Sequence, residues 1–146
     1  MRKDRQQRIH WRFGPPLIWM LVISGFSTAA FSAVQTGRVL MPILHWLLPD
    51  AAPAALGLIH LGIRKAAHLF EFGMLALLWY RAIVAGRAGW AAGAAGMVLA
   101  LSVSFAALDE LHQTLVPGRT ATVTDVGWDG VGAALALGAR RVILRS

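Results

Sequence analysis

Ionisable and amide side chains gather at the ends of three apolar stretches of this chain. They form a candidate polar cluster of nine residues: Lys65, His68, Glu71, Asp109, Glu110, Gln113, Arg119, Asp125 and Asp129. Carboxylates and imidazoles can transfer protons, whereas guanidinium and ammonium groups bind anions. Because a charge inside a membrane is costly unless it is paired or hydrated, these residues predict a functional site or an internal salt-bridge network.

The spacing of these residues places them on shared helix faces. Lys65, His68 and Glu71 are three residues apart, which keeps them within an arc of about 120° on a helix. Asp125 and Asp129 are four residues apart and also share a face. Lys65 and Glu71 could instead form an ordinary ion pair, and Asp125 could be a helix N-cap.

Composition identifies the elements that must position the cluster as membrane helices. The chain is 57% hydrophobic and only 14% charged, with a mean hydropathy of +0.59, unlike soluble domains. Apolar runs predict an all-α, integral membrane bundle of about four transmembrane helices, near residues 15–33, 66–85, 89–108 and 124–144. Residues 1–146 are expected to form a single domain.

The first loop is apolar but interrupted. Residues 39–63 contain Pro42, Pro49, Asp50 and Pro53, which favour two short interfacial helices over another span. A true span here would invert the orientation of everything that follows.

Small residues recur at three- and four-residue steps through the third apolar run. This seam predicts the central helix-packing contact of the bundle. Its members are Gly86, Gly89, Gly93, Gly96, Ala100 and Ala107.

Basic residues predict the orientation. Ten of the 14 Lys and Arg residues fall on one side of the predicted spans, and cytoplasmic loops retain this excess. Both termini are therefore expected in the cytoplasm of a bacterium, with the polar cluster at the outer face of its cytoplasmic membrane.

The basic start and the first apolar run also suit a cleaved signal peptide, but Pro15 and Pro16 favour a retained helix. Because the basic residues flank apolar runs, the net charge of +7 does not predict nucleic-acid binding.

Several kinds of chemistry lack the residues that they need. The chain has no cysteine, which excludes disulfides, thiolate nucleophiles and cysteine metal sites. No metal-ligand spacing is present, and neither a metal nor another cofactor is predicted. No serine belongs to the cluster, so a serine nucleophile is not expected.

Arg119, in a Pro-Gly-Arg turn, could bind a phosphate or bridge to Asp109 or Asp125.

The motifs RKAAHLFEFGMLALL and DELHQTLVPGRTATVTDVGWDGVG resemble those of the VanZ-like membrane proteins. The shared pattern is a Lys-x-x-His helix start, an Asp-Glu-x-x-Gln helix end, a Pro-Gly-Arg turn and an Asp that opens the last helix. The resemblance spans about residues 64–138. It implies a role in low-level resistance to glycopeptides such as teicoplanin, and its signature positions here are Lys65, His68, Asp109, Glu110, Gln113, Arg119 and Asp125.

Three functional hypotheses follow. The first is an outward-facing polar cavity that binds a lipid headgroup, a glycopeptide or a cell-wall precursor without obligatory catalysis. The alternative is a membrane enzyme acting on a lipid-linked phosphate or sugar, with Lys65 and Arg119 holding the anion and Asp109, Glu110 or His68 as the acid or base. The third is a proton-coupled carrier, which would require a homo-oligomer of four-helix chains in the lipid bilayer.

Overall fold

The computed structural model describes residues 2–85, 87 and 89–144, with side chains from residue 11 onward. This part of the chain is helical and contains no strand. The elements, in order, are α1 (Arg2–Phe26), the short 3-10 helix η1 (Ala29–Phe31), α2 (Ala33–Leu47), α3 (Pro53–Val84), α4 (Ala92–Gln113) and α5 (Val123–Ile143).

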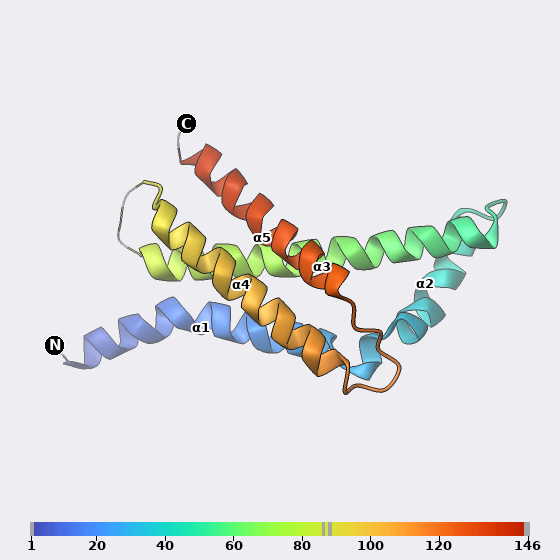
Figure 1. Cartoon of the computed structure of the whole chain (residues 1–146), viewed down its shortest axis with the longest axis horizontal. Coiled ribbons are helices and arrows are strands. Elements are labelled where there is room, and N and C mark those ends of the chain that lie inside the picture. The colour runs from blue at the N-terminus through green and yellow to red at the C-terminus, as the bar shows by residue number, and fades with distance from the viewer. Residues whose placement is uncertain (1, 86, 88, 145–146) are drawn as a thin grey trace.

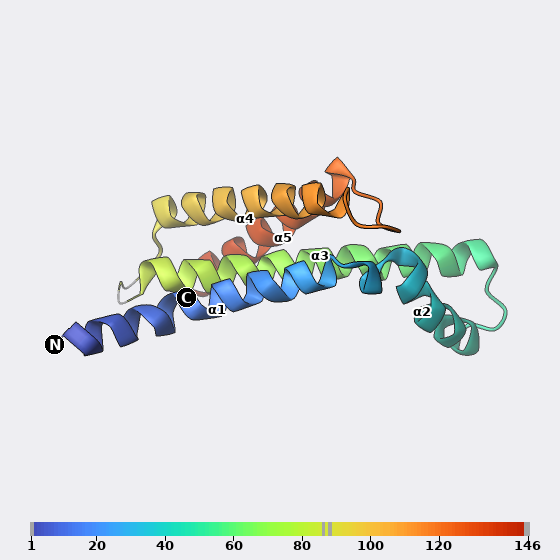
Figure 2. The same ribbon diagram turned by 90° about the horizontal axis from the view of Figure 1, so that it is seen from below.

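Helix α3 is the axis of the molecule. It has 32 residues and therefore extends for about 48 Å at 1.5 Å per residue. It contacts α1, α2, α4 and α5, and Figure 2 shows it between α1 and α4. The start of α1 and the end of α5 lie at one end of the bundle, and α2 and the α4–α5 loop lie toward the other (Figure 1).

The closest helix contact joins α3 to α5. A Cβ atom added at Gly132 would lie 2.3 Å from the backbone oxygen of Leu69, and one at Gly73 would lie 3.2 Å from the oxygen of Gly132. Glycine is therefore what lets the two backbones approach. This contact sets the register in which the polar residues of α3 and α5 face one another.

Two apolar clusters form the core along α3. One joins α3, α4 and α5 and contains Ala76, Tyr80, Ala95, Val98, Ala133 and Leu137. The other joins α1, α3 and α4 and contains Ile23, Phe72, Leu75 and Ala106. Large apolar side chains such as Ile18, Leu21, Leu108 and Leu135 are exposed, as expected for a surface that faces lipid.

Two described helices are long and apolar enough to cross a membrane. They are α3 and residues 92–114, and a third span results if residues 11–26 and 29–47, which meet at a bend of 69°, are taken together. Helix α5 is not among them; it carries two aspartates and two arginines. Two or three spans are thus supported, and the expected number of four is not confirmed.

The first loop differs from the expectation in one respect. Helix α2 is a separate short helix, but the second predicted interfacial helix is continuous with α3. Pro53 occupies the first turn of α3, where its missing N–H costs no hydrogen bond, and no proline follows it in this helix. The first helix was expected to begin at residue 15, but α1 begins at Arg2. Pro15 and Pro16 therefore lie inside this helix and not at its start.

The predicted glycine seam is not the central contact. A Cβ atom added at Gly93 or Gly96 would meet nothing within 4 Å, and Gly89, with a φ of 79°, precedes α4. Gly86 lies outside the described residues. Spacing identified a smooth face of α4, but the close approach uses Gly73 and Gly132 on other helices.

Candidate functional site

A pocket of about 320 Å³ lies where the ends of α1 and α4 meet α2 and the middle of α3. One part of its lining is apolar and includes Phe26, Phe31, Leu40 and Ile63. The other part is polar and contains Ser27, Thr36, Arg64, His68, Glu71, Asp109, Gln113 and Arg119. The volume falls at the lower end of the range for small-molecule sites.

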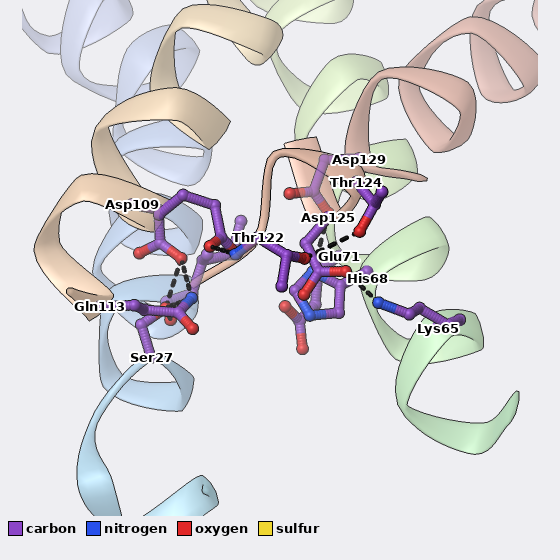
Figure 3. Close-up of polar contacts among 12 residues, drawn as sticks. Ser27, Lys65, His68, Glu71, Asp109, Gln113, Thr122, Thr124, Asp125 and Asp129 are labelled. Carbon is purple, nitrogen blue, oxygen red and sulfur yellow. Dashed lines mark hydrogen bonds and ion pairs between the residues drawn. The ribbon is translucent and has the colours of Figure 1, made fainter. Parts of the chain in front are cut away.

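Two ion pairs between α3 and α5 stand beside the pocket (Figure 3). The Lys65 ammonium donates to Asp125 Oδ1. One turn farther along, His68 Nδ1 lies 2.9 Å from Asp129 Oδ1. The Asp129 side chain is only 2% exposed, so its imidazole partner satisfies a carboxylate that water does not reach freely.

Helix α5 begins with Val123, and Thr122 is its N-cap residue. The N-cap alternative for Asp125 is therefore wrong. Asp125 lies within the first turn of the helix, and its side chain reaches across to Lys65. A carboxylate in this turn also interacts favourably with the helix dipole.

A second polar group joins α1 to the end of α4. Ser27 Oγ donates to Asp109 Oδ2 over 2.5 Å, and Gln113 Nε2 donates to the same oxygen over 2.8 Å. All three residues are buried. Figure 3 shows this group separated from the Lys65 and His68 pairs. The expectation that no serine belongs to the cluster is wrong, because Ser27, far away in sequence, is brought there by packing of α1.

Glu110 holds the loop that leads into α5. Its Oε2 atom accepts the Thr122 N–H over 2.8 Å. Its Oε1 atom is buried and has no hydrogen-bond partner in the described part of the chain. Glu110 is not part of the pocket lining, so its observed contact is structural.

Arg119 closes the end of α1. Its Nε atom donates to the carbonyl oxygens of Ser27 and Thr28 over 3.2 and 3.1 Å, and its Nη2 atom donates to that of Phe26. A helix leaves its last carbonyl groups without partners, and a cation favours this end of the dipole. Instead of bridging to Asp109 or Asp125, Arg119 therefore attaches the α4–α5 loop to α1.

The surroundings of Arg119 shift the pKa of its guanidinium group in both directions. Burial lowers the pKa of its guanidinium group and Arg64 acts in the same direction, whereas Asp109, Glu71 and Glu110 raise it. Arginine stays protonated in proteins. The pocket thus keeps a fixed positive charge beside its carboxylates. Several N–H groups of the Arg119 guanidinium already donate to the three backbone carbonyls.

Glu71 differs from the other carboxylates. It lines the pocket, and among the described residues its side chain forms neither a hydrogen bond nor a close ion pair. Its electrostatic neighbours are His68, Asp109, Asp129 and Arg119. The backbone carbonyl of Glu71 accepts the Trp19 indole N–H over 2.8 Å, which fixes this turn of α3 against α1. Glu71 therefore lines the pocket from a fixed turn of α3, and its carboxylate has no hydrogen-bond partner in the described part of the chain.

The nine predicted residues divide between the pocket and its support. His68, Glu71, Asp109, Gln113 and Arg119 line the pocket, whereas Lys65, Glu110, Asp125 and Asp129 do not. Sequence reasoning missed Ser27, Thr36 and Arg64 as lining residues. Of these three, only Arg64 had a signal in the sequence, because it directly precedes Lys65. The described residues contain no group of three or more His, Asp or Glu side chains placed to hold a metal ion.

Comparison with known proteins gives a family for the chain. The VanZ/LLP1 family model matches residues 10–144, nearly the whole length and more than the motifs alone cover. No curated protein and no solved structure gives a significant match. The chain therefore belongs to the VanZ/LLP1 family.

Proposed function

We propose that this membrane protein binds the polar head of an amphipathic envelope molecule and thereby alters the access of glycopeptide antibiotics, without obligatory catalysis. The ligand is a glycopeptide such as teicoplanin or a lipid-linked cell-wall precursor. The observation that carries the proposal is the Glu71 carboxylate, which lines a pocket with an apolar wall and has no hydrogen-bond partner within the described chain.

The two parts of the pocket suit an amphipathic ligand. Phe26 and Phe31 pack edge to face, with ring centroids 5.0 Å apart, and both are partly exposed. Together with Leu40 and Ile63 they offer apolar surface to a hydrocarbon chain or an aromatic group. The polar wall then faces the head of the same molecule.

The charges of the polar wall restrict the head. The Glu71 carboxylate accepts hydrogen bonds, which suits an ammonium group, a hydroxyl or an amide N–H. Arg64 donates to the Phe31 carbonyl and to Thr36 over 3.1 and 3.4 Å, and its guanidinium keeps further N–H groups for an acceptor. A head with several donors and an anionic group, such as a glycopeptide or a sugar diphosphate, meets both requirements.

Membership in the VanZ/LLP1 family supports the antibiotic part of the proposal. Resistance to teicoplanin-type compounds is the property associated with VanZ-like proteins. The described geometry supports binding as the means, because most candidate groups other than Glu71 already have protein partners.

The test compares teicoplanin susceptibility in cells that carry the wild type, Glu71→Gln, Asp50→Asn or an empty vector. Asp50→Asn is the matched control, because it also removes one carboxylate charge but lies at an exposed turn away from the pocket. We expect the wild type and Asp50→Asn to raise the inhibitory concentration, and Glu71→Gln to return it to the vector value. A wild type equal to the vector would overturn the proposal.

We also propose that the pocket opens to the outer face of the cytoplasmic membrane, as the basic residues predict. Cysteine substitution tests this without background, because the chain has no cysteine. Thr122 is exposed at the pocket end, and Ala85 is exposed just after α3 at the opposite end. A membrane-impermeant maleimide should label Thr122→Cys and not Ala85→Cys in intact cells, and the reverse pattern would contradict the orientation.

Hydrolysis of a lipid-linked phosphate is a second candidate, favoured by one contact. Ser27 Oγ lies 2.5 Å from Asp109 Oδ2, and both residues line the pocket. In this reaction Ser27 attacks the terminal phosphorus of a polyprenyl diphosphate while Asp109 accepts the hydroxyl proton. Polyprenyl phosphate leaves as the old P–O bond breaks, and water then hydrolyses the phosphoserine.

Purified protein and polyprenyl diphosphate distinguish the two candidates. Catalysis predicts phosphate release by the wild type, its loss in Ser27→Ala and its retention in Ser104→Ala, which alters an exposed serine of α4. Binding alone predicts no phosphate release by any of these proteins.

A further inference from the structure

A second pocket lies at the opposite end of the bundle from the candidate site. Its volume is about 410 Å³, and it is formed by the end of α3, the connection to α4 and the end of α5. Three arginines from these separate segments line it: Arg81, Arg87 and Arg140. The ends of α3 and α5 lie on the same side of the molecule in Figure 1.

These arginines have no anionic partner among the described residues. None of their side chains forms a hydrogen bond or an ion pair there, whereas Arg12, at the same end, donates to the Ala82 carbonyl over 3.2 and 2.8 Å. Among the residues whose side chains the structure describes, the carboxylates are Asp50, Glu71, Asp109, Glu110, Asp125 and Asp129, and none of them lines this pocket. Because like charges repel, three guanidinium groups that line one pocket favour an external anion.

The rest of this pocket is apolar. Leu77, Leu78 and Val84 line it next to the arginines, and Tyr80 adds an aromatic ring. The Tyr80 hydroxyl accepts the Ala91 N–H over 2.9 Å and keeps its own hydrogen to donate. A free inorganic anion would use the guanidinium groups but not this apolar surface. An anionic lipid uses both, with its phosphate at the arginines and the start of an acyl chain along the leucines.

We infer that this basic pocket is a binding site for an anionic phospholipid, distinct from the candidate functional site. Phosphate suits the site because the planar guanidinium fork binds its oxygens in pairs. The bound lipid places a negative charge among the three arginines and links α3 to α5 at the end where no ion pair joins them in the described chain.

The test measures lipid retention on the purified full-length protein by native mass spectrometry, with phosphatidylglycerol or phosphatidylcholine added. The matched variants are Arg140→Gln and Arg141→Gln, since these neighbours on α5 are both exposed but only Arg140 lines the pocket. We expect preferential retention of phosphatidylglycerol, weakened about fivefold by Arg140→Gln, the ratio that corresponds to ~1 kcal/mol per basic residue at an anionic surface. Arg141→Gln should retain the lipid as the wild type does.

Arg81→Gln provides a second variant on a different helix and should weaken retention by a similar factor. Equal retention of the two lipids, or equal losses in Arg140→Gln and Arg141→Gln, would overturn the inference. Inorganic phosphate separates the two sources of the anion. If an equimolar amount of it displaces the bound phosphatidylglycerol, the pocket is a free-anion site; retention of the lipid at that concentration supports the lipid, because the apolar lining adds to its binding.

Discussion

Gly132→Ala should separate α3 from α5 and loosen the polar site. The new Cβ atom would lie 2.3 Å from the Leu69 oxygen, 2.7 Å from its Cα atom and 2.9 Å from its carbonyl carbon. Ordinary carbon contacts begin near 3.5 Å, so the helices must move apart by about 1 Å. The obstacle is backbone and cannot rotate away, and overpacking of this kind costs about 1–3 kcal/mol.

The assay is thermal unfolding of the purified protein in detergent. At about 2–4 °C per kcal/mol for a chain of this size, Gly132→Ala should lower the apparent melting temperature by about 2–12 °C. Gly127→Ala is the control on the same helix, because a Cβ atom there meets nothing within 4 Å. It should be neutral or stabilising, since alanine favours a helix over glycine by about 1 kcal/mol. Equal melting temperatures for the wild type and Gly132→Ala would refute the packing argument.

Three further substitutions test the polar contacts. Arg119→Lys replaces the guanidinium group, which donates to three backbone carbonyls, with a single ammonium group, and it should increase amide hydrogen exchange in the α4–α5 loop. The control Arg38→Lys alters an exposed arginine of α2 and should leave that exchange unchanged. Tyr80→Phe removes the acceptor of the Ala91 N–H and should cost about 0.5–1.5 kcal/mol in the same thermal assay; an unchanged melting temperature would contradict that hydrogen bond. Asp129→Asn removes the buried carboxylate charge that faces His68 and should destabilise the protein by about 1–3 kcal/mol. A variant more stable than the wild type would show that burying this pair lowers the free energy of unfolding.

Helical spacing predicted which polar residues share a face, but not how the faces pair. The three-residue step between Lys65 and His68 and the four-residue step between Asp125 and Asp129 match across α3 and α5. Their register depends on the close approach at Gly132, and nothing local in the sequence relates that glycine to Leu69. Residue type and periodicity thus identified the members of the site and left their partners undetermined.

Glycine spacing was misleading for the same reason. The repeated small residues of α4 gave the more regular pattern, yet a Cβ atom at Gly93 or Gly96 would meet no neighbour, whereas Gly73 and Gly132 carry the helix contact. A small residue permits close approach but does not cause it. The partner backbone must also be brought there by the rest of the fold.

Long-range contacts account for the two largest surprises in the site. Ser27 follows α1 and meets Asp109, 82 residues away in the chain. Arg119 reaches the same segment and binds its backbone carbonyls rather than a carboxylate. Backbone acceptors carry no residue-specific signal, so the sequence favoured the acidic neighbours of Arg119 over the end of α1.

Ligand protection of single cysteines tests the central claim, that the pocket between α1, α2, α3 and α4 binds the head of an envelope molecule. Leu40 lines the pocket, whereas its neighbour Val39 is exposed on α2 and does not. Maleimide labelling of Leu40→Cys and Val39→Cys is measured on purified protein with and without teicoplanin or a polyprenyl-diphosphate disaccharide. We expect one of these ligands to slow labelling at Leu40→Cys alone; unchanged labelling at Leu40→Cys with both ligands would contradict the claim.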